Sequence, residues 1–150
     1  MKQIIFIFSI LFVFVSCNSD DSDNKSSNVT YSEILKGDIY NGKDSNPKGN
    51  LVIKDQTTWN DVLSKMNLIL PANMIFPDTN IDFTKYQVIA VFDQVRNYGG
   101  YSIDITKITE TRNRIIVKVK QLKPGGIATV ITQPYHIVKI PASNKKVVFD

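Results

Sequence analysis

The chain has 150 residues, of which 43% are hydrophobic and 21% charged; this length suits one globular domain, and this composition excludes a wholly disordered chain. Its single cysteine excludes an internal disulfide framework. The formal net charge of +4 permits a polyanionic partner without requiring one.

The first sixteen residues are typical of an export signal. A cation precedes a mostly apolar stretch, residues 4–15, which is too short as a helix to span the roughly 30 Å hydrocarbon core of a membrane. The small residue Ser16 directly precedes Cys17, as signal cleavage requires. This stretch resembles a bacterial lipobox, although Phe14 stands where that pattern prefers Leu, Val or Ile.

The lipobox resemblance implies cleavage between Ser16 and Cys17 and attachment of acyl chains such as palmitate to Cys17, which hold a protein on a membrane almost permanently. Residues 17–28 are expected to form an acidic flexible tether, because residues 18–28 include no apolar side chain. The serine and two aspartates at 19–21 also resemble an acidic signal for the outer face of the outer membrane. We therefore expect a lipid-anchored protein that is exposed on the surface of a bacterial outer membrane.

Residues 29–150 are predicted to form one ordered domain. Residues 31–40 and 51–54 indicate two strands, separated by a stretch rich in turn-forming residues. Asp55 is a favourable N-cap for a helix over residues 56–66. The spacing of the apolar residues places four of them on one face of that helix: Trp59, Val62, Leu63 and Met66.

The second half of the chain is predicted to be mostly strands. Residues 67–84 indicate an irregular loop over an edge of the core, because two prolines interrupt them. The apolar run at residues 88–92 predicts a central strand that is covered on both faces. A turn at residues 96–100 then precedes a strand over residues 101–109.

The next strand, residues 114–122, is predicted to form a hairpin with residues 101–109 around a three-residue loop, with Asn113 in the left-handed region. This register places the apolar residues Ile105 and Val119 opposite each other. It also makes two cross-strand pairs of opposite charge, Asp104 with Lys120 and Glu110 with Arg114.

The end of the chain completes the predicted sheet. A turn at residues 123–126 is followed by a short strand or ordered loop over residues 127–131 and a strand over residues 135–140, and residues 145–149 close the chain. These elements predict an α+β fold, a mainly antiparallel β-sheet with one amphipathic helix packed against it.

The sequence offers few groups for catalysis. His136 is the only histidine, and we expect it to be hydrogen-bonded at the margin of the core rather than catalytic. Cysteine and histidine ligands are too few for a zinc site, and no glycine-rich loop joins a strand to a helix. The two glycine pairs, residues 99–100 and 125–126, join strand-like segments, and we expect turns that need positive φ there. We therefore expect no enzymatic activity, no metal and no cofactor. One alternative stays open, a hydrolase with an unusual acidic site built from Asp82, Asp93, Asp104 and Glu110.

A cationic row lies on one face of the strand over residues 114–122. It consists of Arg114, Lys118 and Lys120, with Lys123 just beyond. We expect a solvated face, partly neutralised by Asp104 and Glu110. A surface lipoprotein that binds a glycan or another polyanion through this row is an alternative function, whereas nucleic acid is not an expected partner on a cell surface.

Four pieces of the second half follow one another in a distinctive order: the apolar strand at 88–92, the Gly99-Gly100-Tyr101-Ser102-Ile103 stretch, the Pro124-Gly125 turn, and the Gln133-Pro134-Tyr135 ending that runs to Pro141. Together, over about residues 82–141, they resemble the PrcB C-terminal domain family. The resemblance implies a lipoprotein without established catalysis that associates with a secreted surface protease and helps to stabilise or mature it.

The leading expectation is therefore a non-enzymatic surface lipoprotein that binds or stabilises another exported protein, with a protease as the partner class that the resemblance implies. Exposed turns that carry tyrosine and arginine make strong anchors for a partner. The candidate contacts are Arg96, Asn97, Tyr98, Gly99, Gly100 and Tyr101 in one turn, and Lys123, Pro124, Gly125 and Gly126 in the other.

Overall fold

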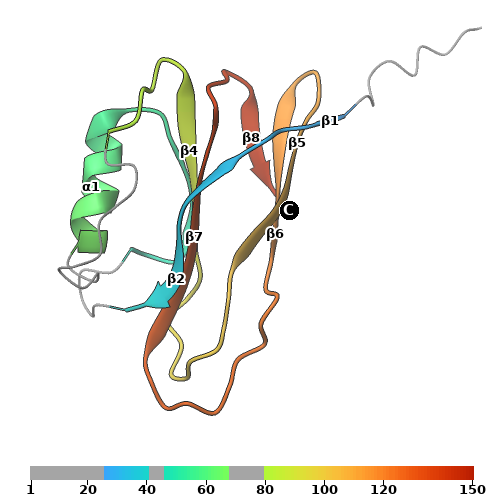
Figure 1. The fold of residues 1–150 in the computed structure, drawn as a ribbon. Helices are drawn as coiled ribbons and strands as arrows, with labels where there is room; N and C mark the ends of the chain where they lie inside the picture. Colours follow the sequence, from blue (N-terminus) through green and yellow to red (C-terminus); the bar gives the residue numbers. More distant parts are fainter. Residues whose placement is uncertain (1–25, 41–45, 68–79) are drawn as a thin grey trace, which may run out of the picture.

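The computed structural model describes residues 26–40, 46–67 and 80–150. In this part of the chain, one helix and two four-stranded sheets form three stacked layers, with the helix on one outer side (Figure 1). The predicted signal and Cys17 lie outside the described residues. The α+β class is confirmed, since nearly all strand neighbours are antiparallel and the helix packs on a sheet.

The middle sheet lies directly under the helix. Its strands, in spatial order, are β2 (Ser32–Ile39), β7 (Thr132–Pro141), β4 (Tyr86–Phe92) and β3 (Gly49–Ile53), and every neighbouring pair is antiparallel.

The outer sheet covers the other face of the middle sheet. Its strands, in spatial order, are β1 (Ser27–Asn28), β5 (Asp104–Glu110), β6 (Arg114–Lys120) and β8 (Lys146–Phe149). The β6–β8 pair is parallel and the others are antiparallel. Order therefore begins before the predicted start at residue 29, because Ser27 and Asn28 pair with β5.

Helix α1 (Gln56–Asn67) confirms the predicted cap and the predicted apolar face. The Thr58 amide donates to Asp55 Oδ1 at 2.8 Å, and the Thr58 hydroxyl donates to Oδ2 at 2.8 Å. The backbone hydrogen bond from Thr58 lowers the pKa of Asp55. All four predicted apolar side chains are buried against the middle sheet: Trp59, Val62, Leu63 and Met66.

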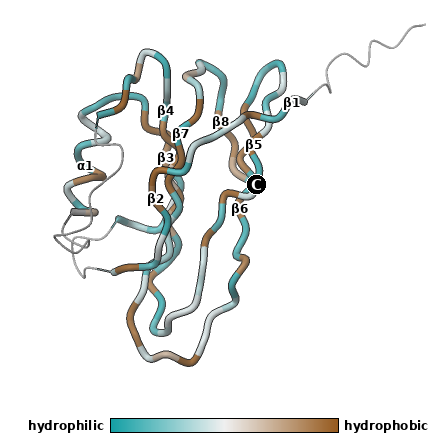
Figure 2. The backbone as a smooth tube through the Cα atoms, viewed as in Figure 1, coloured by the Kyte–Doolittle hydropathy of each residue, from teal (hydrophilic) through white to brown (hydrophobic). Residues whose placement is uncertain are grey.

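Strand β4 confirms the prediction of a strand that is covered on both faces. Successive side chains of a strand point to opposite faces. Accordingly, Val88 and Phe92 pack in the core under α1, whereas Ile89 and Val91 pack in a second core between the two sheets. Figure 2 shows the corresponding hydrophobic stretches along the strands of the middle sheet. β4 has β3 and β7 as neighbours, so it is an internal strand.

The predicted loop over residues 67–84 lies largely outside the described residues. At its described end, Ile81 is buried and Phe83 is half-buried, and both pack on the core under α1. The described part of the chain contains no helix that is both long enough and apolar enough to cross a bilayer.

The β5–β6 hairpin confirms part of the predicted register and corrects the rest. Asp104 lies opposite Lys120 and Ile105 opposite Val119, as predicted, but a bulge at Thr106 shifts the later pairs by one residue. Consequently Glu110 lies opposite Ile115 rather than opposite Arg114.

The hairpin loop also differs from the prediction. The Thr111 amide donates to the Arg114 carbonyl at 2.8 Å, which leaves a loop of only two residues, Arg112 and Asn113. No non-glycine residue in the described part has a positive φ, so the left-handed Asn113 was wrong. The bulge shifts the register by one residue and so shortens the loop, which closes without the left-handed positions that most two-residue hairpin loops use.

Candidate functional site

Two long connections cross between the sheets at one end of the molecule. Residues 93–103 join β4 to β5, and residues 121–131 join β6 to β7 (Figure 1). We call them the paired crossover loops. Backbone hydrogen bonds join them: the Gly99 amide donates to the Ala128 carbonyl at 2.9 Å, and the Gly126 amide donates to the Gly99 carbonyl at 2.8 Å. The structure thus brings the two predicted turns together.

Arg96 stabilises the first of these loops from inside. Its Nη2 and Nε lie 2.7 and 3.0 Å from Asp93 Oδ2, and its guanidinium carbon lies 4.6 Å from the centre of the Tyr101 ring. The Arg96 side chain is only 22% exposed. Its charge is therefore already paired within the loop, and Tyr98, which is 49% exposed, offers a partner more surface.

The two glycine pairs confirm the predicted need for positive φ at one glycine each. Gly100 has φ 82° and Gly125 has φ 105°. Gly125 also lies against Tyr101, since a Cβ there would come within 2.3 Å of Cζ of the ring. Tyr101 therefore lies between Arg96 on one loop and Gly125 on the other.

The paired crossover loops expose most of the large hydrophobic side chains that the described surface presents. Seven such side chains are exposed, and Tyr86 is the one that lies elsewhere. The other six are Val95, Tyr98, Leu122, Ile127, Val130 and Ile131. Ile127 is 97% exposed, and brown segments mark this end of the tube in Figure 2.

The sequence prediction did not identify Ile127, Val130 and Ile131 as surface contacts. Their segment has the residues of a short strand, but it forms no strand in the structure. The available signal was an apolar stretch between two turn-forming sequences to which no partner strand was assigned.

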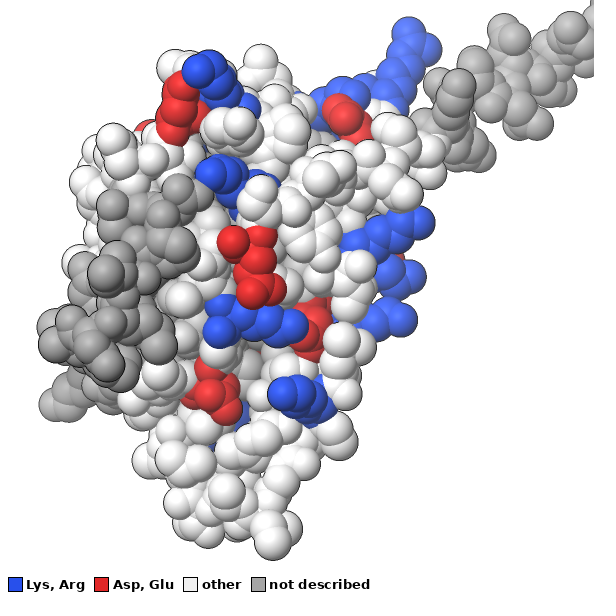
Figure 3. Space-filling view, in the orientation of Figure 1, with Lys and Arg blue, Asp and Glu red and all other residues white. Residues whose placement is uncertain are grey.

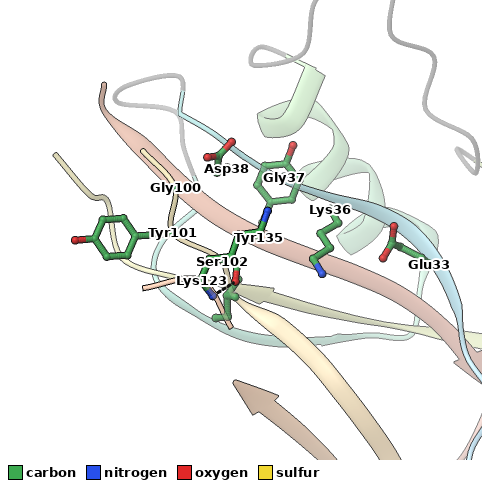
Figure 4. A pocket seen from close by; sticks show the side chains of 10 residues that line it. Glu33, Lys36, Gly37, Asp38, Gly100, Tyr101, Ser102, Lys123 and Tyr135 are labelled. Atoms are coloured by element: carbon green, nitrogen blue, oxygen red, sulfur yellow. Dashed lines mark hydrogen bonds between the residues drawn. The ribbon is translucent and has the colours of Figure 1, made fainter. Parts of the chain in front are cut away.

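A cavity of about 360 Å³ adjoins the paired crossover loops. The loops contribute Gly100, Tyr101 and Lys123, and the middle sheet contributes Lys36 and Tyr135 (Figure 4). Burial, and secondarily the charge of Asp38, raises the pKa of the Tyr135 hydroxyl, so this group is a neutral hydrogen-bond donor. The cavity can accept a side chain from a partner, with cations and a phenol at its wall.

A polar network beside this cavity fixes the loops. Asp104 is buried, and it accepts hydrogen bonds from the Ser102 hydroxyl at 2.5 Å and from the Leu122 amide at 3.2 Å, while Lys36 pairs with its other oxygen. The Lys123 amide donates to Ser102 Oγ at 3.0 Å. Burial alone would raise the pKa of Asp104, but the contacts with Lys36, Ser102 and Leu122 outweigh it and lower this pKa.

His136 connects the two sheets, as a hydrogen-bonded residue at the margin of the core. Its Nδ1 accepts the Ile105 amide at 2.9 Å, so the ring proton is on Nε2, 3.2 Å from Glu33 Oε2. Burial, followed by the charge of Lys36, lowers the pKa of His136 below 6.5, and the charges of Glu33 and Asp104 oppose this shift only partly.

Each acid of the alternative hydrolase site has its own cationic partner. One pair joins Asp104 to Lys36. The other three have N–O distances of 2.6–3.1 Å and join Asp82 to Lys85, Asp93 to Arg96, and Glu110 to Lys145. Among the described residues, no three His, Cys, Asp or Glu side chains gather closely enough to hold a metal ion.

The predicted cationic row is divided between two places. Arg114, Lys118 and Lys120 are exposed on β6, whereas Lys123 lies in the wall of the cavity.

Comparison with known proteins finds one family. Residues 87–141 match the family model described as PrcB C-terminal, and this segment covers nearly all of β4, the paired crossover loops, β5, β6 and β7. No curated protein and no solved structure matches the chain. All ten candidate contact residues of the sequence prediction lie inside the matched segment.

Proposed function

Because residues 87–141 of this chain match the PrcB C-terminal family, we propose that the protein is a non-enzymatic surface lipoprotein that binds and stabilises an exported protease. The family supports an accessory role in a protease complex. The observation that carries the proposal is the group of exposed hydrophobic side chains on the paired crossover loops.

Such a group favours a binding surface on physical grounds. Water disfavours apolar surface, and soluble proteins rarely expose it in continuous patches unless a partner covers it. Six of the seven exposed large hydrophobic side chains of the described residues lie on the two loops. Tyrosine at the centre of an interface is an effective anchor, and the apolar side chains around it exclude water.

The loops are also held in shape before binding. Backbone hydrogen bonds join Gly99 to Ala128 and Gly126, and the network around Asp104 holds the amides of Leu122 and Lys123. A surface that is ordered in advance loses little conformational entropy on binding, which favours affinity.

The position of β1 supports access to the loops after membrane anchoring. Strand β1 and the paired crossover loops lie at opposite ends of the molecule (Figure 1). A tether that runs from Cys17 to β1 reaches the domain at the end away from the loops, so that anchoring leaves them open to a partner.

The polar groups support binding rather than catalysis. The Arg96 guanidinium holds Asp93, and Lys36 and Ser102 hold Asp104. His136 accepts a backbone amide through Nδ1 and is therefore not available there as a general base.

The proposal is tested by capture from intact cells that produce the lipoprotein with a carboxy-terminal tag. Cross-linking, purification through the tag and mass spectrometry should recover an exported protease. The double variant Tyr98→Ser and Ile127→Ser removes two exposed hydrophobic side chains, and we expect it to recover at least about tenfold less protease, which corresponds to a loss of about 1.4 kcal/mol in binding free energy.

Tyr86→Ser is the matched control, since it removes an exposed aromatic side chain, 38% exposed, outside the loops. It should recover as much protease as the unaltered protein. Equal recovery by the double variant would contradict the assignment of the loops, and capture of partners without any protease would contradict the partner class.

A further inference from the structure

The outer sheet presents a row of cations to solvent. Along β6 the buried side chains of Ile115 and Val117 alternate with outward positions, which hold three exposed cations. With one exposed cation each from β5 and β8, the face carries Lys107, Arg114, Lys118, Lys120 and Lys146. Figure 3 shows Lys and Arg side chains gathered along the edge of the molecule on the side of this sheet.

Acidic side chains of the described residues offset little of this charge, although Asp104 lies opposite Lys120 in the register. None of its five cations forms an ion pair there. The two acids that were expected to neutralise it are engaged elsewhere: Asp104 is buried and paired with Lys36 of the middle sheet, and Glu110 pairs with Lys145 at 2.6 Å. Of the expected partial neutralisation, only the position of Asp104 opposite Lys120 is confirmed, and neither acid forms an ion pair with the face.

The register brings like charges together across neighbouring strands. Lys107 lies opposite Lys118, and Arg114 lies opposite Lys146. Directly opposed like charges destabilise a sheet, because their Cβ atoms are only about 5 Å apart. An anionic surface against this face would remove that repulsion.

The shape of the face and the position of the tether identify one anionic surface. The five cations spread over three neighbouring strands of one sheet, which suits a plane of phosphate groups. Strand β1 is the edge strand of the same sheet. The nine residue steps from Cys17 to Ser26 span at most about 30 Å, so a lipid on Cys17 would hold this sheet close to the bilayer.

We propose that the outer face of the outer sheet lies on the phosphate headgroups of anionic lipids in the membrane to which the chain is tethered. The orientation rests on the proposed lipid anchor. Each basic side chain near an anionic bilayer adds to the attraction, and one acyl signal combined with a basic patch anchors more firmly than either alone. In this orientation, α1 faces away from the bilayer and the paired crossover loops stay open at the side.

The test uses the mature chain with Cys17→Ser, which needs neither the lipid nor a protease. The chain is sedimented with vesicles of phosphatidylcholine alone or with about a third of phosphatidylglycerol, and the expected result is binding to the anionic vesicles that weakens with added salt. The variant Lys107→Gln and Lys118→Gln should lower the partition coefficient about 25-fold, at about fivefold for each cation.

The matched control is Lys65→Gln and Lys85→Gln, which removes the same formal charge from positions outside the outer sheet. It should bind like the unaltered chain apart from a small effect of net charge. Equal binding to both kinds of vesicle, or equal losses in the two double variants, would overturn the proposal. Binding to a soluble acidic polysaccharide without binding to the vesicles would also overturn it and would indicate a glycan-binding face. Because the loops are unchanged in every variant, failure of this test leaves protease capture intact.

Discussion

Gly125 determines, as a single residue, how the two crossover loops fit together. Its φ of 105° lies in a region that other residues rarely adopt, and the Tyr101 ring occupies the space where a Cβ would be. The sequence predicted that a glycine here needs positive φ. The contact with Tyr101 was not predictable, because it depends on two loops that are distant in the chain.

Gly125→Ala should therefore displace Tyr101 and weaken protease capture. The strained backbone should also lower the free energy of unfolding by about 1–2 kcal/mol. Urea unfolding together with capture from cells measures both effects.

Gly126→Ala is the control at the adjacent position. Its φ is not positive, and an added Cβ would lie 3.5 Å from its nearest neighbour, which is ordinary contact distance. It should leave stability and capture nearly unchanged. If the two variants behave alike, the Tyr101 contact does not shape the binding surface.

Arg96 shows the limit of prediction for a single side chain. An arginine in an exposed turn suggested a partner anchor, but Asp93 and Tyr101 engage it from within the loop. Neither contact could be foreseen without the path of the loop. The anchor role is better supported for Tyr98 and Ile127, whose side chains extend into solvent.

At the level of elements, the strands and the helix could be predicted from local sequence patterns, whereas the register of the β5–β6 hairpin could be predicted only in part. The cap at Asp55 and the double-sided burial of β4 depend on neighbouring residues alone, and both were predictable. The bulge at Thr106 was not, because the Ile105 amide beside it donates to His136 on the other sheet. No residue of the hairpin itself indicates that contact.

The burial of His136, with the charge of Lys36 beside it, predicts how stability depends on pH. His136 has a folded pKa below the ordinary 6.5, so the unfolded chain binds more protons as pH falls through this region. Stability should therefore be full above about pH 7 and should decline below about pH 6.5, before most carboxylates titrate.

His136→Asn retains an acceptor near the position of Nδ1 but does not titrate. It should be less stable at neutral pH, because a smaller side chain fills the space, and its stability should change less between about pH 7 and pH 5. Urea unfolding at a series of pH values measures the two curves. Curves with the same slope in this interval would show that His136 contributes nothing to the pH dependence.

For the whole molecule, the α+β class and the helix packed on a sheet were predicted, but the division into two sheets was not. That division depends on which strands become neighbours, including the parallel pairing of β8 with β6 at the end of the chain. It also sends Asp104 toward the middle sheet and leaves the outer sheet with an unneutralised cationic face. The resulting protein has an apolar end on the paired crossover loops and a basic side on the outer sheet.

A photo-reactive amino acid placed at position 127 or 118 of the full chain, produced in intact cells, tests the central claim most directly. Position 127 belongs to the most exposed hydrophobic side chain of the loops, and position 118 lies on the basic face. We expect light to join position 127, and not position 118, to an exported protease. The absence of a protease product at position 127, or the same protease product at both positions, would contradict the account.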